Sequence, residues 1–139
     1  METRETATGG CLCGAVRYQV NTPFAGARAC HCSQCRKQSG HYMIGARVSD
    51  WHKVAITGEK YITWYRASQK ARRGFCNICG SHLFFFGDSG QGALLAASLD
   101  SPTGLSLLGH MFVSDKGDYY AIADGLPQSG GWQLNESSA

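Results

Sequence analysis

Residues 9–14 read Gly-Gly-Cys-Leu-Cys-Gly, residues 30–35 read Cys-His-Cys-Ser-Gln-Cys, and residues 76–80 read Cys-Asn-Ile-Cys-Gly. These three clusters contain all seven cysteines of the 139-residue chain. Thiolates separated by one or two residues can converge on one soft cation, and four of them close a tetrahedral zinc site while three leave one position open. Because seven is four plus three, the sequence predicts one closed zinc site and one open, reactive zinc site.

A disulfide framework is the competing explanation of these cysteines, and several features speak against it. Seven is an odd number, so one thiol would stay unpaired. A bond between Cys11 and Cys13 would close a small, strained loop. Cysteine makes up about 5% of the chain, below the roughly 8–10% of disulfide scaffolds, and the polar N-terminus lacks the apolar core of a secretion signal. We therefore predict metal binding and a cytoplasmic location.

The charge and hydropathy of the chain argue against nucleic-acid and membrane partners. The formal net charge of +3 counts every thiol as neutral, and seven zinc-bound thiolates with two zinc ions would bring it close to zero. The adjacent basic pairs, Arg36-Lys37 and Arg72-Arg73, are interpreted first as solvated surface. No run approaches the roughly 18 apolar residues that a membrane span requires.

Short runs of aromatic and β-branched residues, separated by glycine and other turn residues, fill most of the chain. No long stretch carries a helical stripe of apolar residues, although residues 33–39 could form one or two helical turns. We therefore predict one all-β domain over residues 1–139, with little helix. The expected strands are residues 14–20, 42–48, 54–57, 61–66, 82–86, 93–98, 110–113 and 119–122.

The first and last clusters are the best candidates for the closed site. In an extended strand residues two apart point the same way, so Cys11 and Cys13 would present both sulfurs to one side. Cys76 and Cys79 have the spacing of a tight turn in which backbone N–H groups can donate to sulfur. Gly80 would supply the unusual backbone angle that leaves this turn. Zinc at the four thiolates would stabilise the fold.

The middle cluster, Cys30, Cys32 and Cys35, leaves a fourth position open. His31 is a rival ligand, but between two cysteines of an extended segment its ring should point away. Spacing also leaves other partitions open, such as one mixed cluster fed by all three groups. Three anionic sulfurs make zinc a weak acceptor, which suits a sulfur nucleophile better than a hydrolytic water. Arg36 and Lys37 either hold a substrate carboxylate or are plain surface charges.

These motifs resemble the glutathione-dependent formaldehyde-activating enzymes, relatives of centromere protein V. The matching stretches are residues 9–18, 30–40, 75–85, 110–116 and 124–127, so the core of the resemblance covers about residues 9–127. The resemblance implies a β-tent fold of twisted antiparallel sheets with two zinc ions. It assigns a structural zinc to Cys11, Cys13, Cys76 and Cys79, and a catalytic zinc to Cys30, Cys32 and Cys35. We expect the closed site to keep its zinc through purification and the three-cysteine site to lose it more easily.

The activity that the resemblance implies belongs to the carbon–sulfur lyases, with a small-molecule thiol and a small aldehyde as partners. Glutathione would add to formaldehyde and give S-hydroxymethylglutathione. No glutathione-specific motif is visible, so related thiols and aldehydes stay open. His110 and Asp115 are candidate acid–base groups near the open zinc, or an ordinary strand-end histidine and turn aspartate.

Three other functions compete with this one. A non-catalytic zinc module used for protein contacts would predict a basic tail or a large exposed apolar patch, and the sequence shows no such tail. A methionine sulfoxide reductase would need a reactive cysteine outside the zinc ligands, and none is left over. A nucleic-acid-binding zinc ribbon would interleave aromatic residues with a basic face, whereas the aromatic residues Trp51, Trp64, Tyr65 and Trp132 are isolated.

Overall fold

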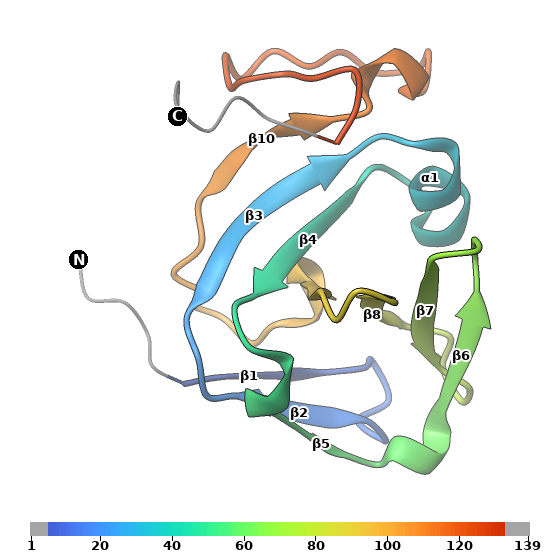
Figure 1. The fold of residues 1–139 in the computed structure, drawn as a ribbon, viewed down its shortest axis with the longest axis vertical. Helices are drawn as coiled ribbons and strands as arrows, with labels where there is room; N and C mark the ends of the chain where they lie inside the picture. Colours follow the sequence, from blue (N-terminus) through green and yellow to red (C-terminus); the bar gives the residue numbers. More distant parts are fainter. Residues whose placement is uncertain (1–5, 133–139) are drawn as a thin grey trace.

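The computed structural model describes residues 6–132 as two β-sheets with one α-helix, α1 (Ser33–Ser39) (Figure 1). The smaller sheet is antiparallel, with the strand order β1 (Ala7–Gly10), β2 (Arg17–Val20), β5 (Val54–Thr57). The larger sheet has the order β10-β3-β4-β9-β8-β7-β6. Its strands are β3 (Phe24–Cys30), β4 (Met43–Val48), β6 (Ile62–Arg66), β7 (Ala71–Cys76), β8 (His82–Gly87), β9 (Gly92–Leu95) and β10 (Leu107–Met111).

The predicted all-β fold with little helix is confirmed, and so is the short helix at residues 33–39. Neighbouring strands of both sheets are antiparallel except β10, which pairs with β3 in parallel. A parallel pair needs a long connection, and the chain between β3 and β10 contains most of the larger sheet. Within residues 6–132, no helix is long and apolar enough to cross a membrane.

Three strands escape the sequence pattern. β1 and β3 consist largely of alanine and glycine, and β7 carries two arginines, so none of them has the β-branched alternation that marks a strand. They form because neighbouring strands complete their hydrogen bonds: β3, for example, lies between β10 and β4. The strand predicted at residues 119–122 is wrong, since this segment is a turn followed by irregular backbone.

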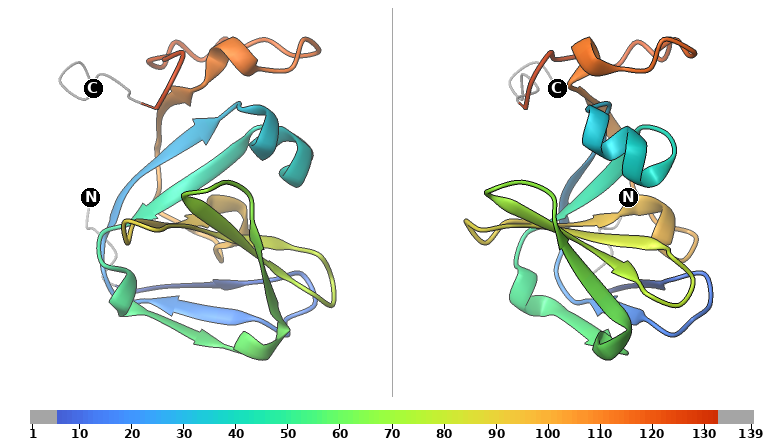
Figure 2. Two further views of the ribbon diagram at one scale, coloured as in Figure 1. Left: turned by 45° about the vertical axis from the view of Figure 1, so that its right-hand side comes forward. Right: turned by 90° about the vertical axis from the view of Figure 1, so that its right-hand side faces the viewer.

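Figure 2 shows the smaller sheet at one end of the molecule and the C-terminal segment, residues 112–132, at the other, above α1. The main core includes the fully buried side chains of Val16, Leu83, Phe84 and Leu94. A second apolar cluster lies at the end of β3 and contains cysteines 30 and 35 with Met43, Leu95 and Met111. The middle cysteine cluster is therefore embedded in apolar surroundings.

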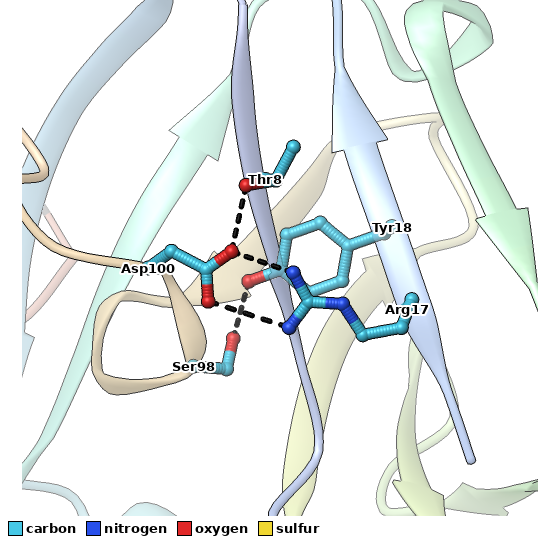
Figure 3. Close-up of polar contacts among 5 residues, drawn as sticks. All are labelled: Thr8, Arg17, Tyr18, Ser98 and Asp100. Carbon is cyan, nitrogen blue, oxygen red and sulfur yellow. Dashed lines mark hydrogen bonds and ion pairs between the residues drawn. The ribbon is translucent and has the colours of Figure 1, made fainter. Parts of the chain in front are cut away.

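A polar network joins the smaller sheet to the loop after β9 (Figure 3). The two guanidinium Nη atoms of Arg17 donate to the two carboxylate oxygens of Asp100, which also accepts from the Thr8 hydroxyl at 2.7 Å. The Tyr18 hydroxyl contacts the Ser98 hydroxyl at 2.5 Å, and burial raises the pKa of Tyr18 to about 12. The network holds the residues just before Cys11 in place.

Replacing Gly9 with alanine should destabilise this junction. A Cβ atom at Gly9 would lie 2.4 Å from the Tyr18 hydroxyl and 2.5 Å from the backbone oxygen of Ser98, so the strand or the loop must move. We expect the free energy of unfolding to fall by about 1–3 kcal/mol, as in other overpacked sites. Chemical denaturation measures the change. Gly45→Ala is the control in another strand, because its Cβ would meet its nearest neighbours at an ordinary 3.7 Å; equal losses in both variants would contradict the explanation.

Candidate metal centres

Cys11, Cys13, Cys76 and Cys79 meet in one group, the four-cysteine cluster, with all sulfurs within 4.8 Å of one another. The Cys13 sulfur lies 3.6 Å from that of Cys11 and 3.8 Å from that of Cys76. A zinc ion with Zn–S bonds of about 2.3 Å in a tetrahedron requires sulfurs roughly 3.8 Å apart. All seven cysteines are free thiols. The donors and their spacing therefore fit zinc.

Two turns build the four-cysteine cluster. The strand expected at Cys11 and Cys13 is wrong: the segment is a turn, in which Gly14 has a φ of +82° and donates to the Cys11 carbonyl at 3.2 Å. This turn lies between β1 and β2 and brings the sulfurs of Cys11 and Cys13 together. The second turn forms as expected, because Ile78 N–H donates to the Cys76 sulfur at 3.4 Å and Gly80 has a φ of +79°.

Ser81 connects the two turns of the four-cysteine cluster. Its hydroxyl accepts from Leu12 N–H at 2.9 Å and lies 3.2 Å from the Cys79 sulfur. The hydrogen bond from Ser81 lowers the pKa of the Cys79 thiol to about 5. At neutral pH this thiol is therefore ready to bind a metal as thiolate.

Cys30, Cys32 and Cys35 form the second group, the three-cysteine cluster, again with sulfurs within 4.8 Å of one another. Cys30 ends β3, Cys32 is the N-cap residue of α1, and Cys35 lies in the helix. The Cys32 sulfur accepts from Cys35 N–H at 3.4 Å. Hydrogen bonds from the Cys30 and Cys35 thiols, together with the charge of Arg73, lower the pKa of Cys32.

Arg73 lies against the three-cysteine cluster, which corrects the interpretation of Arg72-Arg73 as a surface pair. Only 3% of Arg73 is exposed, whereas Arg72 is exposed and stacks on Trp64. Both Nη atoms of Arg73 lie 3.5 Å from the Cys35 sulfur. The alternation of a strand could have predicted the position of Arg73. If residues 71–76 are recognised as a strand, Arg73 lies on the same face as Ala71.

A cleft of about 700 Å³ opens beside the three-cysteine cluster. Its basic lining residues are Arg28, Arg47, Lys70 and Arg73, and Asp115 is the acidic one among the described residues that line it. Methionine and aromatic side chains form the apolar part of the wall: Met43, Phe85, Met111, Phe112 and Trp132. A positive, partly apolar cleft of this volume suits a small anionic organic molecule. Sequence reasoning missed Arg28, Arg47 and Lys70, which are far apart in the chain.

Arg36 and Lys37 are not among the residues, within the described part of the chain, that line this cleft. Arg36 donates through Nε to the Asp115 carbonyl at 3.1 Å, and Lys37 is exposed on α1. Arg36 therefore fastens α1 to the segment that carries Asp115. Whether either side chain touches a substrate stays a prediction.

His31 and His110 do not line the cleft, and they contact each other instead. His31 is fully buried, and its two ring nitrogens lie 2.7 Å from the Tyr120 hydroxyl and 2.9 Å from His110 Nδ1. Burial lowers the pKa of His31 to about 4. Both nitrogens are thus engaged away from the cysteine sulfurs, as the alternation of an extended segment predicts.

Acid should destabilise the protein through His82. Burial lowers its pKa to about 4, and neither ring nitrogen has a hydrogen-bond partner among residues 6–132. The unfolded chain, with a histidine pKa near 6.5, binds more protons between these values, so the free energy of unfolding decreases as the pH falls from about 6.5 toward 4.

We expect His82 to account for about 2 kcal/mol of this loss. His82→Leu should flatten the curve of unfolding free energy against pH by that amount. His52→Leu, at a histidine whose side chain is 98% exposed, should not change it. Curves of equal slope for wild type and His82→Leu would contradict the assignment.

A β fold that gathers four free thiols in one cluster and three in another, with a cationic cleft at the second, defines a cysteine-rich protein equipped for two metal centres. The profile of one family, glutathione-dependent formaldehyde-activating enzyme, matches residues 6–115. The chain therefore belongs to the glutathione-dependent formaldehyde-activating enzyme family, as the cysteine motifs predicted.

Individual relatives agree with the family. A Halomonas elongata protein, named provisionally as a glutathione-dependent formaldehyde-activating enzyme, is 33% identical over 85 residues, or 56% of this chain and 54% of that protein. An uncharacterized lyase of Schizosaccharomyces pombe is 28% identical over 83 residues, 60% of this chain and 59% of the lyase. The matches thus span little more than half of each relative. A Rhodobacter sphaeroides crystal structure aligns with a TM-score of 0.60 at 27% identity, covering 75% of this chain and 99% of the other.

Proposed function

We propose that the three-cysteine cluster and its cleft form a zinc-dependent site that adds glutathione to formaldehyde, giving S-hydroxymethylglutathione. One observation carries the proposal: three thiols that could share a metal open onto a cleft lined by four basic side chains. Membership of the family and the likeness to a protein named as a lyase support it. We also propose a cytoplasmic location, because thiolate ligands need a reducing compartment.

The division of labour between the two clusters follows from the number of their ligands. Four thiolates fill the coordination shell of zinc, so we propose a structural zinc at the four-cysteine cluster. A zinc ion held by Cys30, Cys32 and Cys35 would supply one open position at which an incoming thiol loses its proton but stays nucleophilic. The guanidinium group of Arg73 contacts the Cys35 sulfur through both Nη atoms and offsets the excess negative charge of three thiolates.

The cleft residues would hold and orient the thiol. Glutathione carries two carboxylates, and guanidinium groups bind carboxylates with two parallel hydrogen bonds. Arg47 and Lys70 line the cleft and can hold these carboxylates, while Arg36 and Lys37 remain outer candidates. In the reaction the thiol sulfur forms a bond with the formaldehyde carbon, and the carbonyl π electrons move to oxygen, which takes up the thiol proton. No oxidant or reductant is required.

Arg47→Gln should weaken glutathione binding to the zinc-loaded protein about tenfold, because a charge-assisted hydrogen bond contributes about 1.5–3 kcal/mol. Isothermal titration calorimetry measures the dissociation constant. Arg72→Gln is the control, since Arg72 is exposed and lies outside the cleft. Lys37→Gln tests whether the basic residues of α1, outside the cleft, hold a glutathione carboxylate instead. A tenfold loss in Lys37→Gln with none in Arg47→Gln would move the carboxylate site from the cleft to α1.

The reaction itself is tested by exchange NMR spectroscopy, which follows the conversion of glutathione and formaldehyde above the spontaneous background. We expect acceleration by the wild type and none by Cys32→Ser. If glutathione shows no binding at millimolar concentration, that thiol is excluded. If varied thiols and aldehydes fail as well, a non-catalytic zinc module becomes the better explanation.

A further inference from the structure

Four hydrogen-bonded side chains form a row outside the cleft, next to the three-cysteine cluster. The Tyr120 hydroxyl lies 2.7 Å from His31 Nδ1, His31 Nε2 lies 2.9 Å from His110 Nδ1, and His110 Nε2 lies 2.8 Å from Asp124 Oδ2. His31 is fully buried and His110 is 2% exposed. We call Tyr120, His31, His110 and Asp124 the histidine chain. Nothing in the proposed reaction uses it.

With both rings neutral, one arrangement of protons satisfies every bond of the histidine chain. The Asp124 carboxylate can only accept, so His110 must donate through Nε2–H, which leaves its Nδ1 as an acceptor. His31 then donates through Nε2–H, and its own Nδ1 accepts from the Tyr120 hydroxyl. All donors then point toward Asp124, and each neutral ring is an Nε2–H tautomer. A chain with one consistent direction holds each ring in one orientation.

The C-terminal segment supplies both ends of the histidine chain. The Tyr120 hydroxyl accepts from Gly117 N–H at 3.3 Å, and Asp124 accepts from Leu126 N–H at 3.0 Å. The segment also runs along β10, where His110 N–H donates to the Pro127 carbonyl and Ser129 N–H donates to the His110 carbonyl, both at 2.9 Å. Tyr120 and Asp124 lie beyond residues 6–115, the part that the family profile matches.

His31 is the residue between two of the three cysteines. On one side, Cys30 ends β3; on the other, Cys32 caps α1. His31 N–H donates to the Met111 carbonyl at 3.0 Å, so backbone and ring are both fastened to β10 and the segment after it. A rotation of this peptide would move the Cys30 and Cys32 sulfurs in different directions.

We infer that the histidine chain is a positioning device for the three-cysteine cluster: by fixing His31 from the C-terminal segment, it holds the Cys30 and Cys32 sulfurs where one metal ion can bind both. The inference rests on the metal-binding part of the proposed function and is independent of the substrate. Side chains that orient metal ligands from outside typically change metal affinity 10–100-fold when they are removed.

Metal release provides the test. Protein loaded with two equivalents of Co²⁺, whose thiolate charge-transfer bands report each site, is mixed with excess chelator. We expect a fast phase from the three-cysteine cluster and a slow phase from the four-cysteine cluster. Tyr120→Phe and Asp124→Ala should each accelerate the fast phase about tenfold or more and leave the slow phase unchanged. Tyr119→Phe, at the exposed neighbouring ring, should change neither phase.

Two further measurements separate positioning from general stability. The double variant Tyr120→Phe/Asp124→Ala should release its fast metal little faster than either single variant, because the two residues act through one chain. Long-range proton–nitrogen NMR correlations should show both buried histidines as Nε2–H tautomers.

Four outcomes would overturn the inference: an unchanged fast phase in both variants, equal acceleration of both phases, an Nδ1–H tautomer at His110, or binding of only one metal ion by the wild type. A lack of glutathione activity with the expected release kinetics would instead overturn the proposed reaction and leave the inference intact.

Discussion

Cys13→Ser should yield protein that is insoluble or unfolded at 25 °C. The Cys13 residue is exposed, so the substitution removes a proposed zinc ligand without opening a hole in the core. In small zinc domains the free energy of metal binding is largely folding free energy, on the order of 10–16 kcal/mol near pH 7. Loss of even half of it, about 5–8 kcal/mol, would be comparable to the whole unfolding free energy of a typical small domain. Circular dichroism and solubility after expression measure the result.

Cys32→Ser is the matched variant. Cys32 is partly exposed, and its substitution likewise removes one thiolate, here from the three-cysteine cluster. We expect it to fold and to contain one zinc ion fewer than the wild type, as measured by elemental analysis. Its melting temperature should stay much closer to that of the wild type than the melting temperature of Cys13→Ser. Equal collapse of the two variants would contradict a structural role for one cluster and a catalytic role for the other.

Arg73→Met should weaken metal binding at the three-cysteine cluster about 10²–10³-fold. Three thiolates and a divalent ion carry one excess negative charge, and the cluster lies among Met43, Leu95 and Met111. Removal of one partner of a buried ion pair costs about 3–5 kcal/mol, and each 1.4 kcal/mol corresponds to a factor of ten. Without Arg73 a thiolate would regain neutrality by protonation and leave the metal. Competition with a chromophoric chelator measures the affinity.

Two variants control this prediction. Arg72→Met removes the neighbouring, exposed arginine and should not affect metal affinity at either cluster. Arg73→Lys keeps the charge but cannot form the two-armed contact with the Cys35 sulfur, so its affinity should fall between those of wild type and Arg73→Met. An Arg73→Met protein with unchanged affinity at the three-cysteine cluster would show that the guanidinium does not balance its charge.

Several features were predictable from the sequence because they are local. The spacing of cysteines 76 and 79 predicts a turn, and Gly80 supplies its positive φ. The segment of residues 33–39 forms the expected helix, and the alternation around His31 correctly predicts that its ring turns away from the neighbouring sulfurs. The turn at Cys11 and Cys13 was missed, because a two-residue spacing fits a strand as well as a turn.

The sequence alone determined the family, the all-β class and the two groups of possible metal ligands. The cysteine spacings were sufficient for these groups, because ligands so close in the chain can meet through local geometry. The tertiary structure decided what surrounds these groups. Arg73 reaches Cys35 across 38 residues, and His31 reaches His110 across 79. Contacts at such separations depend on which strands pair, and β10 pairs with β3 in parallel although the strands β4 to β9 lie between them in the chain. The sequence alone therefore predicts that a basic residue on a strand is exposed. Only the tertiary structure shows that another part of the chain covers it.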